Sequence, residues 1–152
     1  MRRWVLAAAA VLAVGCGSED TQPLVQPPPP SDPQRLFGTW QARQPGGYAL
    51  RYVFRRGGTF EHSQGTRQKR GQGTYVFEIK TRGTMRIRGD TVVLRPRSGT
   101  QVRRDPTDPD GNYRRPAQKL RQRYTWSVQG SGASARLTLS IGGGLAVRYR
   151  PG

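Results

Sequence analysis

The sequence predicts an all-β fold: a small antiparallel up-and-down barrel of roughly eight to ten strands, which follows a cleaved signal peptide and a disordered, proline-rich tether. Three observations predict it. Beyond residue 34, short segments alternate apolar and polar residues with a period of two. Turns that contain glycine separate these segments, and no segment has the periodicity of an amphipathic helix. Because each strand would have one apolar face, the sheet must close on itself to avoid exposed edges.

Residues 1–15 have the pattern of a signal peptide. Arg2 and Arg3 supply a basic start, and an apolar run covers residues 4–14. A run of this length is typical of the apolar part of a secretory signal and is too short to remain as a membrane-spanning helix. We therefore expect the leader to be removed and the rest of the chain to be exported.

The residues that end the leader, Ala13-Val14-Gly15-Cys16, resemble the lipobox of bacterial lipoproteins. The resemblance implies that Cys16 receives a diacylglyceryl thioether and becomes an acylated N-terminus, with palmitate among its acyl chains. A single cysteine cannot form a disulfide within its own chain, so lipidation would give Cys16 a use in an exported protein. The alternative is an ordinary secretory leader that leaves Cys16 as a free or intermolecular thiol.

The lipobox resemblance also implies a location: a lipid anchor would hold the exported protein in the cell envelope. Several acyl chains together give stable anchoring, whereas one chain holds only marginally. Gly17 stands where an aspartate would resemble a retention signal for the inner membrane. We therefore expect the outer membrane, at its periplasmic or surface face, if the host is Gram-negative.

Residues 16–34 form the predicted tether between the anchor and the domain. This segment has few large apolar residues and contains the proline run 27–30. It cannot bury enough apolar surface to fold, so we expect disorder with local polyproline II stiffness. The tether would hold the domain off the membrane surface. A proline-rich ligand for a recognition domain is the alternative.

The chain is strongly basic, with 26 lysine and arginine residues against 9 acidic ones and a formal net charge of +17. Such a balance invites a nucleic-acid interpretation, but an exported, lipid-anchored protein rarely meets nucleic acid. Two interpretations remain. The arginines form a solvated exterior, or they attract anionic lipid headgroups, lipopolysaccharide or acidic polysaccharide.

Residues 35–152 are the predicted barrel domain. Glycine-bearing turns at 56–58, 89–90 and 142–144 supply the backbone freedom that tight hairpins require. We expect strands at 36–43, 48–56, 59–64, 73–80, 84–88, 91–97, 100–104, 118–128, 136–141 and 145–150.

The alternation within these strands predicts which side chains face inward. Leu50, Tyr52 and Phe54 share one face, whereas Arg51 and Arg55 share the other, and the same split recurs in most of the expected strands. One face of the sheet is thus aromatic and aliphatic, and the other is mostly arginine and threonine. A barrel with an apolar interior and a cationic exterior is the reverse of a porin, so we do not expect it to span a membrane.

The segment Gly38-Thr39-Trp40 resembles the Gly-x-Trp signature of lipocalins, and later segments are similar in order to bacterial lipocalin-like lipoprotein domains. The resemblance covers residue 35 to the end. It implies that Trp40 plugs the closed end of the barrel, with Arg150 or Arg148 packed across its indole face through cation–π contact. The other segments that carry the resemblance are 52–54, 58–60, 73–75, 89–94, 124–126, 137–139 and 149–150.

The sequence offers little material for catalysis. His62 is the only histidine, so neither a Ser-His-Asp arrangement nor a multi-histidine metal site can form, and we expect it in solvent or at the barrel mouth. The acidic segment 105–112 resembles a calcium loop, but Lys119 stands where the bidentate glutamate should be. We expect a polar hairpin loop with internal ion pairs there. No enzyme activity, catalytic residue, metal or cofactor is expected.

Two functions remain about equally favoured. In the first, an anchored monomeric barrel binds a small hydrophobic molecule or lipid. In the second, the barrel is filled, and the protein is a structural or interaction lipoprotein that contacts anionic envelope components through its arginine-rich exterior. An inhibitor or chaperone-like module that meets anionic partners is a third. The candidate barrel-lining residues are Tyr52, Phe54, Tyr75, Phe77, Met85, Tyr124 and Trp126.

Overall fold

The computed structural model describes residues 32–142 and 144–152, which form a nine-stranded antiparallel sheet. The predicted signal peptide, Cys16 and most of the predicted tether lie outside these residues. Within the described part, no helix is long and apolar enough to cross a bilayer. The strands are β1 (Gly38–Gln44), β2 (Tyr48–Arg55), β3 (Thr59–Arg70), β4 (Gly73–Arg88), β5 (Thr91–Arg104), β6 (Tyr113–Pro116), β7 (Gln122–Gln129), β8 (Arg136–Ile141) and β9 (Leu145–Pro151).

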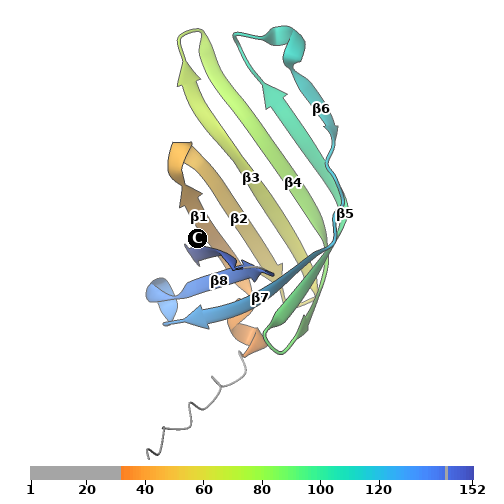
Figure 1. The fold of residues 1–152 in the computed structure, drawn as a ribbon, viewed down its shortest axis with the longest axis vertical. Helices are drawn as coiled ribbons and strands as arrows, with labels where there is room; N and C mark the ends of the chain where they lie inside the picture. The colour runs from red at the N-terminus through yellow and green to blue at the C-terminus, as the bar shows by residue number, and fades with distance from the viewer. Residues whose placement is uncertain (1–31, 143) are drawn as a thin grey trace, which may run out of the picture.

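Eight of these strands close into a barrel, which confirms the predicted fold class (Figure 1). Each strand from β1 to β5 pairs with the next, β5 pairs with β7, and β7, β8 and β9 follow in order. The last strand, β9, returns to pair with β1. The ninth strand, β6, pairs only with the far half of β5 and lies outside this closed set.

The strands β3, β4 and β5 are much longer than the others, at 12, 16 and 14 residues. Their far ends run past β1 and β2 and, together with β6, form a projecting sheet that we call the arm, residues 67–82 and 96–116 (Figure 1). β5 pairs with β7 only through residues 91–94 and then turns to β6 through residues 100–103. The barrel wall is therefore extended on one side.

The structure corrects several of the predicted strands. The strands predicted at 73–80 and 84–88 are one strand, β4, and those predicted at 91–97 and 100–104 are one strand, β5. Gly83 bends the sheet without ending the strand, because the pairing register shifts between Arg82 and Gly83. The predicted strand at 118–128 begins only at Gln122. β6 was not predicted, because one tyrosine followed by two arginines and a proline is too short to show alternation.

The core lies inside the barrel and follows the predicted alternation. On β2, Leu50, Tyr52 and Phe54 are buried, whereas the neighbouring Arg51 and Arg55 are exposed. The same pattern holds on β7 and β8. The side chains that are most completely buried are Trp126, Phe54, Phe60, Leu36, Leu94, Leu137 and Val92. These large groups fill the barrel axis.

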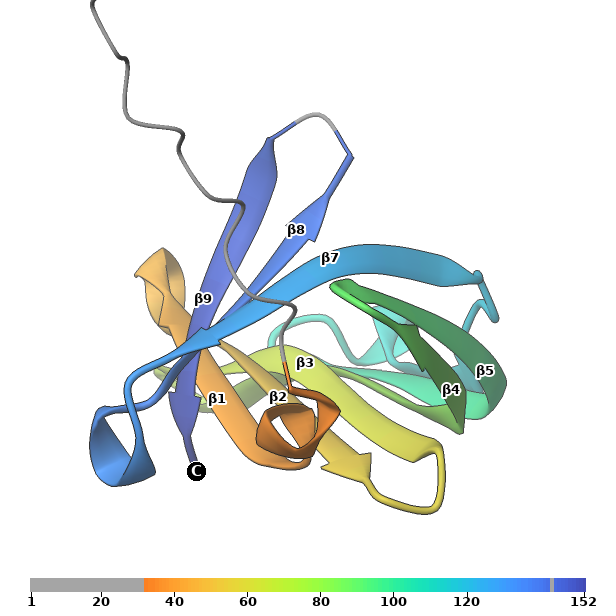
Figure 2. The same ribbon diagram turned by 90° about the horizontal axis from the view of Figure 1, so that it is seen from below.

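A 3-10 turn, η1 (Pro33–Leu36), closes one end of the barrel, as the view from below shows (Figure 2). The Asp32 carboxylate caps the turn by accepting a hydrogen bond from the Gln34 backbone N–H, at 2.9 Å. Leu36 at its end is fully buried. The turn begins at Pro33, two residues ahead of the predicted domain start at Arg35.

The two ends of the barrel differ. The closed end carries η1 and the β2–β3, β4–β5 and β7–β8 connections. The opposite end, which we call the mouth, carries the β1–β2 and β8–β9 connections and lies on the side toward which the arm projects. The chain therefore enters the domain at the end opposite the mouth.

Candidate functional site

The mouth contains a hollow of about 230 Å³. Its walls come from inward-facing side chains near the ends of six barrel strands, namely β1, β2, β3, β7, β8 and β9. The wall is mixed: tyrosines and one histidine, aliphatic side chains, and the amide side chains of Gln44, Gln64 and Gln122. Among the residues that the structure describes, no lysine, arginine or carboxylate side chain lines it. The hollow thus offers apolar contact and neutral hydrogen-bonding groups.

Tyr52 is the centre of an aromatic cluster at the base of this hollow. His62, its cross-strand neighbour on β3, stacks on the Tyr52 ring with the ring centroids 4.2 Å apart and the planes 18° apart. Tyr124 and Tyr149 approach Tyr52 edge-on, at 6.4 and 5.7 Å. The hydroxyl oxygens of Tyr52 and Tyr124 are 3.2 Å apart and share a hydrogen bond. The cluster joins β2, β3, β7 and β9 across the barrel.

Burial keeps the titratable groups of this cluster uncharged. It lowers the pKa of His62 to about 4, because a protonated imidazole would lose its hydration there. Burial also raises the pKa of Tyr52, Tyr124 and Tyr149 above the usual value for a phenol. At neutral pH this cluster therefore presents the neutral imidazole of His62 and the neutral phenols of Tyr52, Tyr124 and Tyr149 to the hollow.

Two aliphatic side chains form an exposed rim above the hollow. Ile141 and Leu145 face each other across the β8–β9 hairpin and are 47% and 69% exposed. Both line the hollow. Exposed aliphatic residues at the edge of a concave site add apolar contact area for a ligand or partner. Neither residue was among the predicted site residues, although their positions beside the glycine turn 142–144 were available as a signal.

The structure divides the predicted barrel-lining residues into three groups. Tyr52 and Tyr124 line the mouth hollow. Phe54, Met85 and Trp126 are buried deeper, where they help to fill the barrel. Tyr75 and Phe77 lie on the arm and are half-buried, away from the hollow, with the Arg70 guanidinium 4.4 Å from the Tyr75 ring centroid. Tyr149 also lines the hollow but was not among the predicted site residues.

At the closed end, Trp40 contacts the turn η1. The Trp40 indole N–H donates a hydrogen bond to the backbone carbonyl of Leu36, at 2.8 Å, and the side chain is buried. Arg150 is exposed and lies opposite Gln41 across the β1–β9 seam. The cation–π pairs among the described residues involve Tyr75 and Tyr113, so neither Arg150 nor Arg148 stacks on Trp40 there.

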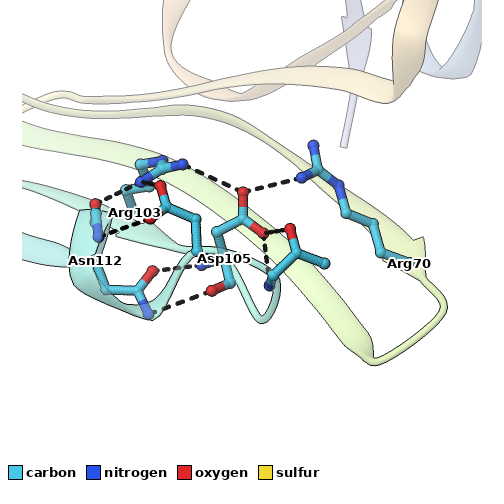
Figure 3. A network of polar contacts seen from close by, with 7 residues as sticks. Arg70, Arg103, Asp105 and Asn112 are labelled. Carbon is cyan, nitrogen blue, oxygen red and sulfur yellow. Dashed lines mark hydrogen bonds and ion pairs between the residues drawn. The ribbon is translucent and has the colours of Figure 1, made fainter.

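The tip of the arm holds the acidic segment 105–112 in a polar network (Figure 3). The buried carboxylate of Asp105 accepts contacts from Arg70 and Arg103, at 2.9 and 3.2 Å, and a hydrogen bond from the Thr107 hydroxyl at 2.7 Å. Asp108 pairs with Arg103 at 2.8 Å. Hydrogen bonds from Thr107, followed by the two arginine charges, hold the pKa of Asp105 below its usual value. These ion pairs confirm the predicted polar loop.

Comparison of the chain with protein-family models, curated proteins and solved structures gives no match. Among the residues that the structure describes, no three His, Cys, Asp or Glu side chains lie close enough together to hold a metal ion. The mouth itself offers tyrosine hydroxyls, a histidine ring and glutamine amides beside aliphatic side chains. These side chains suit the binding of an uncharged molecule.

Proposed function

We propose that this protein is a lipid-anchored protein of the bacterial envelope, acylated at Cys16, whose barrel mouth binds a small uncharged hydrophobic molecule. The observation that carries the binding proposal is the mouth hollow, which combines an aliphatic rim with neutral aromatic groups and has no charged side chain among the described residues that line it. Concave, mostly apolar sites with a few polar groups are the usual form of small-molecule sites. The lipobox and the lipocalin-like segments support the same proposal from the sequence.

The volume of the hollow limits the ligand. Pockets that enclose drug-sized molecules measure from roughly 300 Å³ upward, whereas the mouth hollow measures about 230 Å³. The barrel axis below it is occupied by Phe54, Trp126 and other core side chains. The site therefore suits a small aromatic or aliphatic molecule, or one end of a longer apolar chain that extends toward the arm. The neutral Tyr52, His62 and Tyr124 would orient a hydroxyl or carbonyl group of that ligand.

Two exposed leucines allow a matched test of this proposal. The full chain with Cys16→Ser, which removes the acylation site, is titrated with an apolar fluorescent probe such as N-phenylnaphthylamine. Leu145 lies at the mouth and is 69% exposed, whereas Leu120 is 65% exposed and does not line the hollow. We expect Leu145→Glu to weaken probe binding roughly tenfold, because a carboxylate would have to lose water beside the ligand. Leu120→Glu should leave the affinity unchanged.

Either of two results would contradict the proposal that the mouth binds an apolar ligand. If the Cys16→Ser chain binds no probe, or if the two glutamate variants weaken binding equally, the mouth is not the site. The anchor is tested separately in the unsubstituted chain, by mass spectrometry of its N-terminal peptide after expression in a bacterium. An unmodified Cys16, or a mature chain that begins at another residue, would exclude the proposed lipid anchor and leave the mouth proposal standing.

A further inference from the structure

The outward face of the sheet is hollowed where β1 to β5 lie side by side. Two hollows, of about 460 and 350 Å³, lie on this face and have Arg51, Ser63 and Glu78 in common. They therefore form one continuous depression, which we call the outer groove. The groove crosses β2, β3 and β4, and it extends to β1 at one end and to β5 and β6 at the other.

Small residues make the groove deep. Ser63, Ser98 and Thr100 lie on its floor, and all three are half-buried although they face outward. The long strands also approach each other closely at Gly65, Gly83 and Gly99. A Cβ atom at each of these positions would lie within 3.0 Å of backbone atoms of a neighbouring strand. Glycine inside a strand commonly marks such bends and close approaches of backbones.

The charges along the groove are unbalanced. Its two acids are already paired, Glu61 with Arg55 at 2.9 Å and Glu78 with Lys80 at 3.0 Å. Arg82 is held over the floor, because its Nε–H donates a hydrogen bond to the Ser98 hydroxyl at 2.9 Å. Within the described residues, five arginines that line the groove form no ion pair: Arg43, Arg51, Arg67, Arg82 and Arg114.

We propose that the outer groove binds a linear acidic polysaccharide, whose carboxylate or phosphate groups pair with these arginines while its hydroxyl groups meet Ser63, Ser98 and Thr100. Arginine offers several donors in a planar fork that matches the geometry of carboxylates and phosphates. The serine and threonine hydroxyls can both donate and accept hydrogen bonds, as sugar hydroxyls require. A chain that lies along the groove would meet arginines from one end to the other.

The shape and composition of the groove favour this ligand over two other polyanions. A flat bilayer surface contacts the projecting parts of a protein, so its headgroups would not reach a concave floor. Single-stranded nucleic acids are usually held by aromatic side chains on which the bases stack. Phe77 and His62 border the groove, but strand alternation directs both rings to the opposite face of the sheet. The groove therefore offers charge and hydroxyl contacts without a stacking surface.

This proposal does not depend on the proposed ligand site at the mouth. The groove and the mouth hollow lie on opposite faces of the barrel wall, and the groove arginines do not line the hollow. A change in the groove should leave binding of the apolar probe unaltered. Failure of one proposal is thus distinguishable from failure of the other.

The test uses the full chain in a neutral detergent and a fluorescein-labelled oligogalacturonate, a linear glycan with one carboxylate on each sugar. We expect binding that weakens steadily as salt is added, because paired charges are screened and counterions are released. The double variant Arg51→Gln with Arg82→Gln should bind at least about tenfold more weakly at the same ionic strength. The matched control, Arg123→Gln with Arg148→Gln, removes the same charge from outward positions on β7 and β9, outside the groove.

Several outcomes would overturn the proposal. Equal weakening by the two double variants would mean that the net charge of the exterior, and not the groove, attracts the glycan. Binding of the methyl-esterified, uncharged glycan with equal affinity would exclude charge recognition. Equal or tighter binding of single-stranded DNA, or of vesicles of anionic phospholipid, would assign the surface to another partner.

A measurement on the unsubstituted protein keeps the proposal testable if the groove variant does not fold. Phenylglyoxal modifies accessible arginines, and mass spectrometry locates the modified residues. The glycan should protect Arg51 and Arg82 and leave Arg123 and Arg148 reactive. Equal protection of all four arginines, or protection of none, would contradict binding in the groove.

Discussion

At the scale of single residues, His62 couples the stability of the barrel to pH. Its ring is 7% exposed and stacks on Tyr52, and burial lowers its pKa from 6.5 to about 4. Tyr52, Tyr124 and Tyr149, the titratable groups around it, stay neutral in this range because burial raises their pKa values. Below pH 6.5 the unfolded chain therefore binds a proton that the folded chain does not. The stabilisation that the neutral, buried His62 contributes to the folded state is complete above pH 6.5. It is lost as the pH falls from 6.5 toward 4.

We expect the free energy of unfolding to fall by about 2.5 kcal/mol between pH 7.5 and pH 4.5 through His62 alone. Urea unfolding at the two pH values measures the total change, to which carboxylates also contribute. His62→Phe keeps an aromatic ring on Tyr52 but cannot titrate, so the difference in pH dependence between the two proteins isolates the histidine. An identical pH dependence in the variant would show that His62 is not protected from protonation.

The two buried tryptophans illustrate what single residues in a sequence do and do not reveal. The sequence placed Trp126 on the apolar face through its alternation and Trp40 at the closed end through the resemblance to lipocalins. It did not indicate that the Trp40 indole N–H would donate to the Leu36 carbonyl, because that contact depends on the turn η1. The Trp126 indole N–H, in contrast, is buried without a hydrogen-bond partner among the described residues. A pattern of apolar residues predicts burial but not hydrogen-bonding partners.

At the scale of strands, the glycines inside β3, β4 and β5 determine how the long sheet bends. A Cβ atom on Gly83 would overlap the Arg95 carbonyl oxygen and lie 2.8 Å from the Pro96 Cα atom. Both obstacles are backbone atoms, which cannot rotate away. We expect Gly83→Ala to lower the free energy of unfolding by about 1–3 kcal/mol, the usual cost of overpacking.

Gly71 provides the control for this substitution, because it lies in the β3–β4 turn, where an added Cβ would have no neighbour within 4 Å. Gly71→Ala should change the free energy of unfolding by less than about 0.5 kcal/mol. Urea unfolding of both variants at one pH measures the difference. If the two variants unfold at the same urea concentration, the close approach at Gly83 does not limit the packing of β4 on β5.

The sequence predicted which face of each strand is buried much better than it predicted where strands end. Alternation is a local property, and it correctly separated Leu50, Tyr52 and Phe54 from Arg51. Strand ends depend on partners that are distant in sequence. Gly83 and Gly99 looked like breaks because their neighbours on β5 and β4 could not be seen in the sequence. The outer groove was missed for the same reason, since it results from bends in several strands.

At the scale of the whole molecule, the up-and-down order of strands separates three surfaces. The closed end carries η1, the mouth opens at the other end, and the outer groove runs across the wall. The closed topology was predictable because strands with one apolar face need partners on both edges. The arm was not, because nothing in the alternation distinguishes a strand inside the closed barrel from one that continues past it.

Closure itself depends on a short seam between β1 and β9. The seam aligns Trp40 with Pro151 and Gln41 with Arg150, and the Gly152 backbone N–H donates to the Thr39 carbonyl at 3.1 Å. The pairing of β1 with β2 extends along the whole strand, from Gly38 to Gln44. The seam also joins the two ends of the described domain, so it can form only after the other strands are in place.

A chain that ends at Tyr149 should therefore fold less stably than the full chain, although no core side chain has been removed. It loses both aligned pairs and the Gly152 hydrogen bond, and β1 becomes an open edge beside the buried Trp40. At about 1 kcal/mol for each lost backbone hydrogen bond, together with new exposure of Trp40, we expect a loss of at least about 2 kcal/mol. Hydrogen exchange should accelerate in β1 and β9 first.

A chain that ends at Pro151 keeps the aligned pairs, so it should lose about 1 kcal/mol or less. Equal urea midpoints for the chain ending at Tyr149 and the full chain would mean that the barrel is held by its other strand pairs and that the seam contributes nothing to its stability.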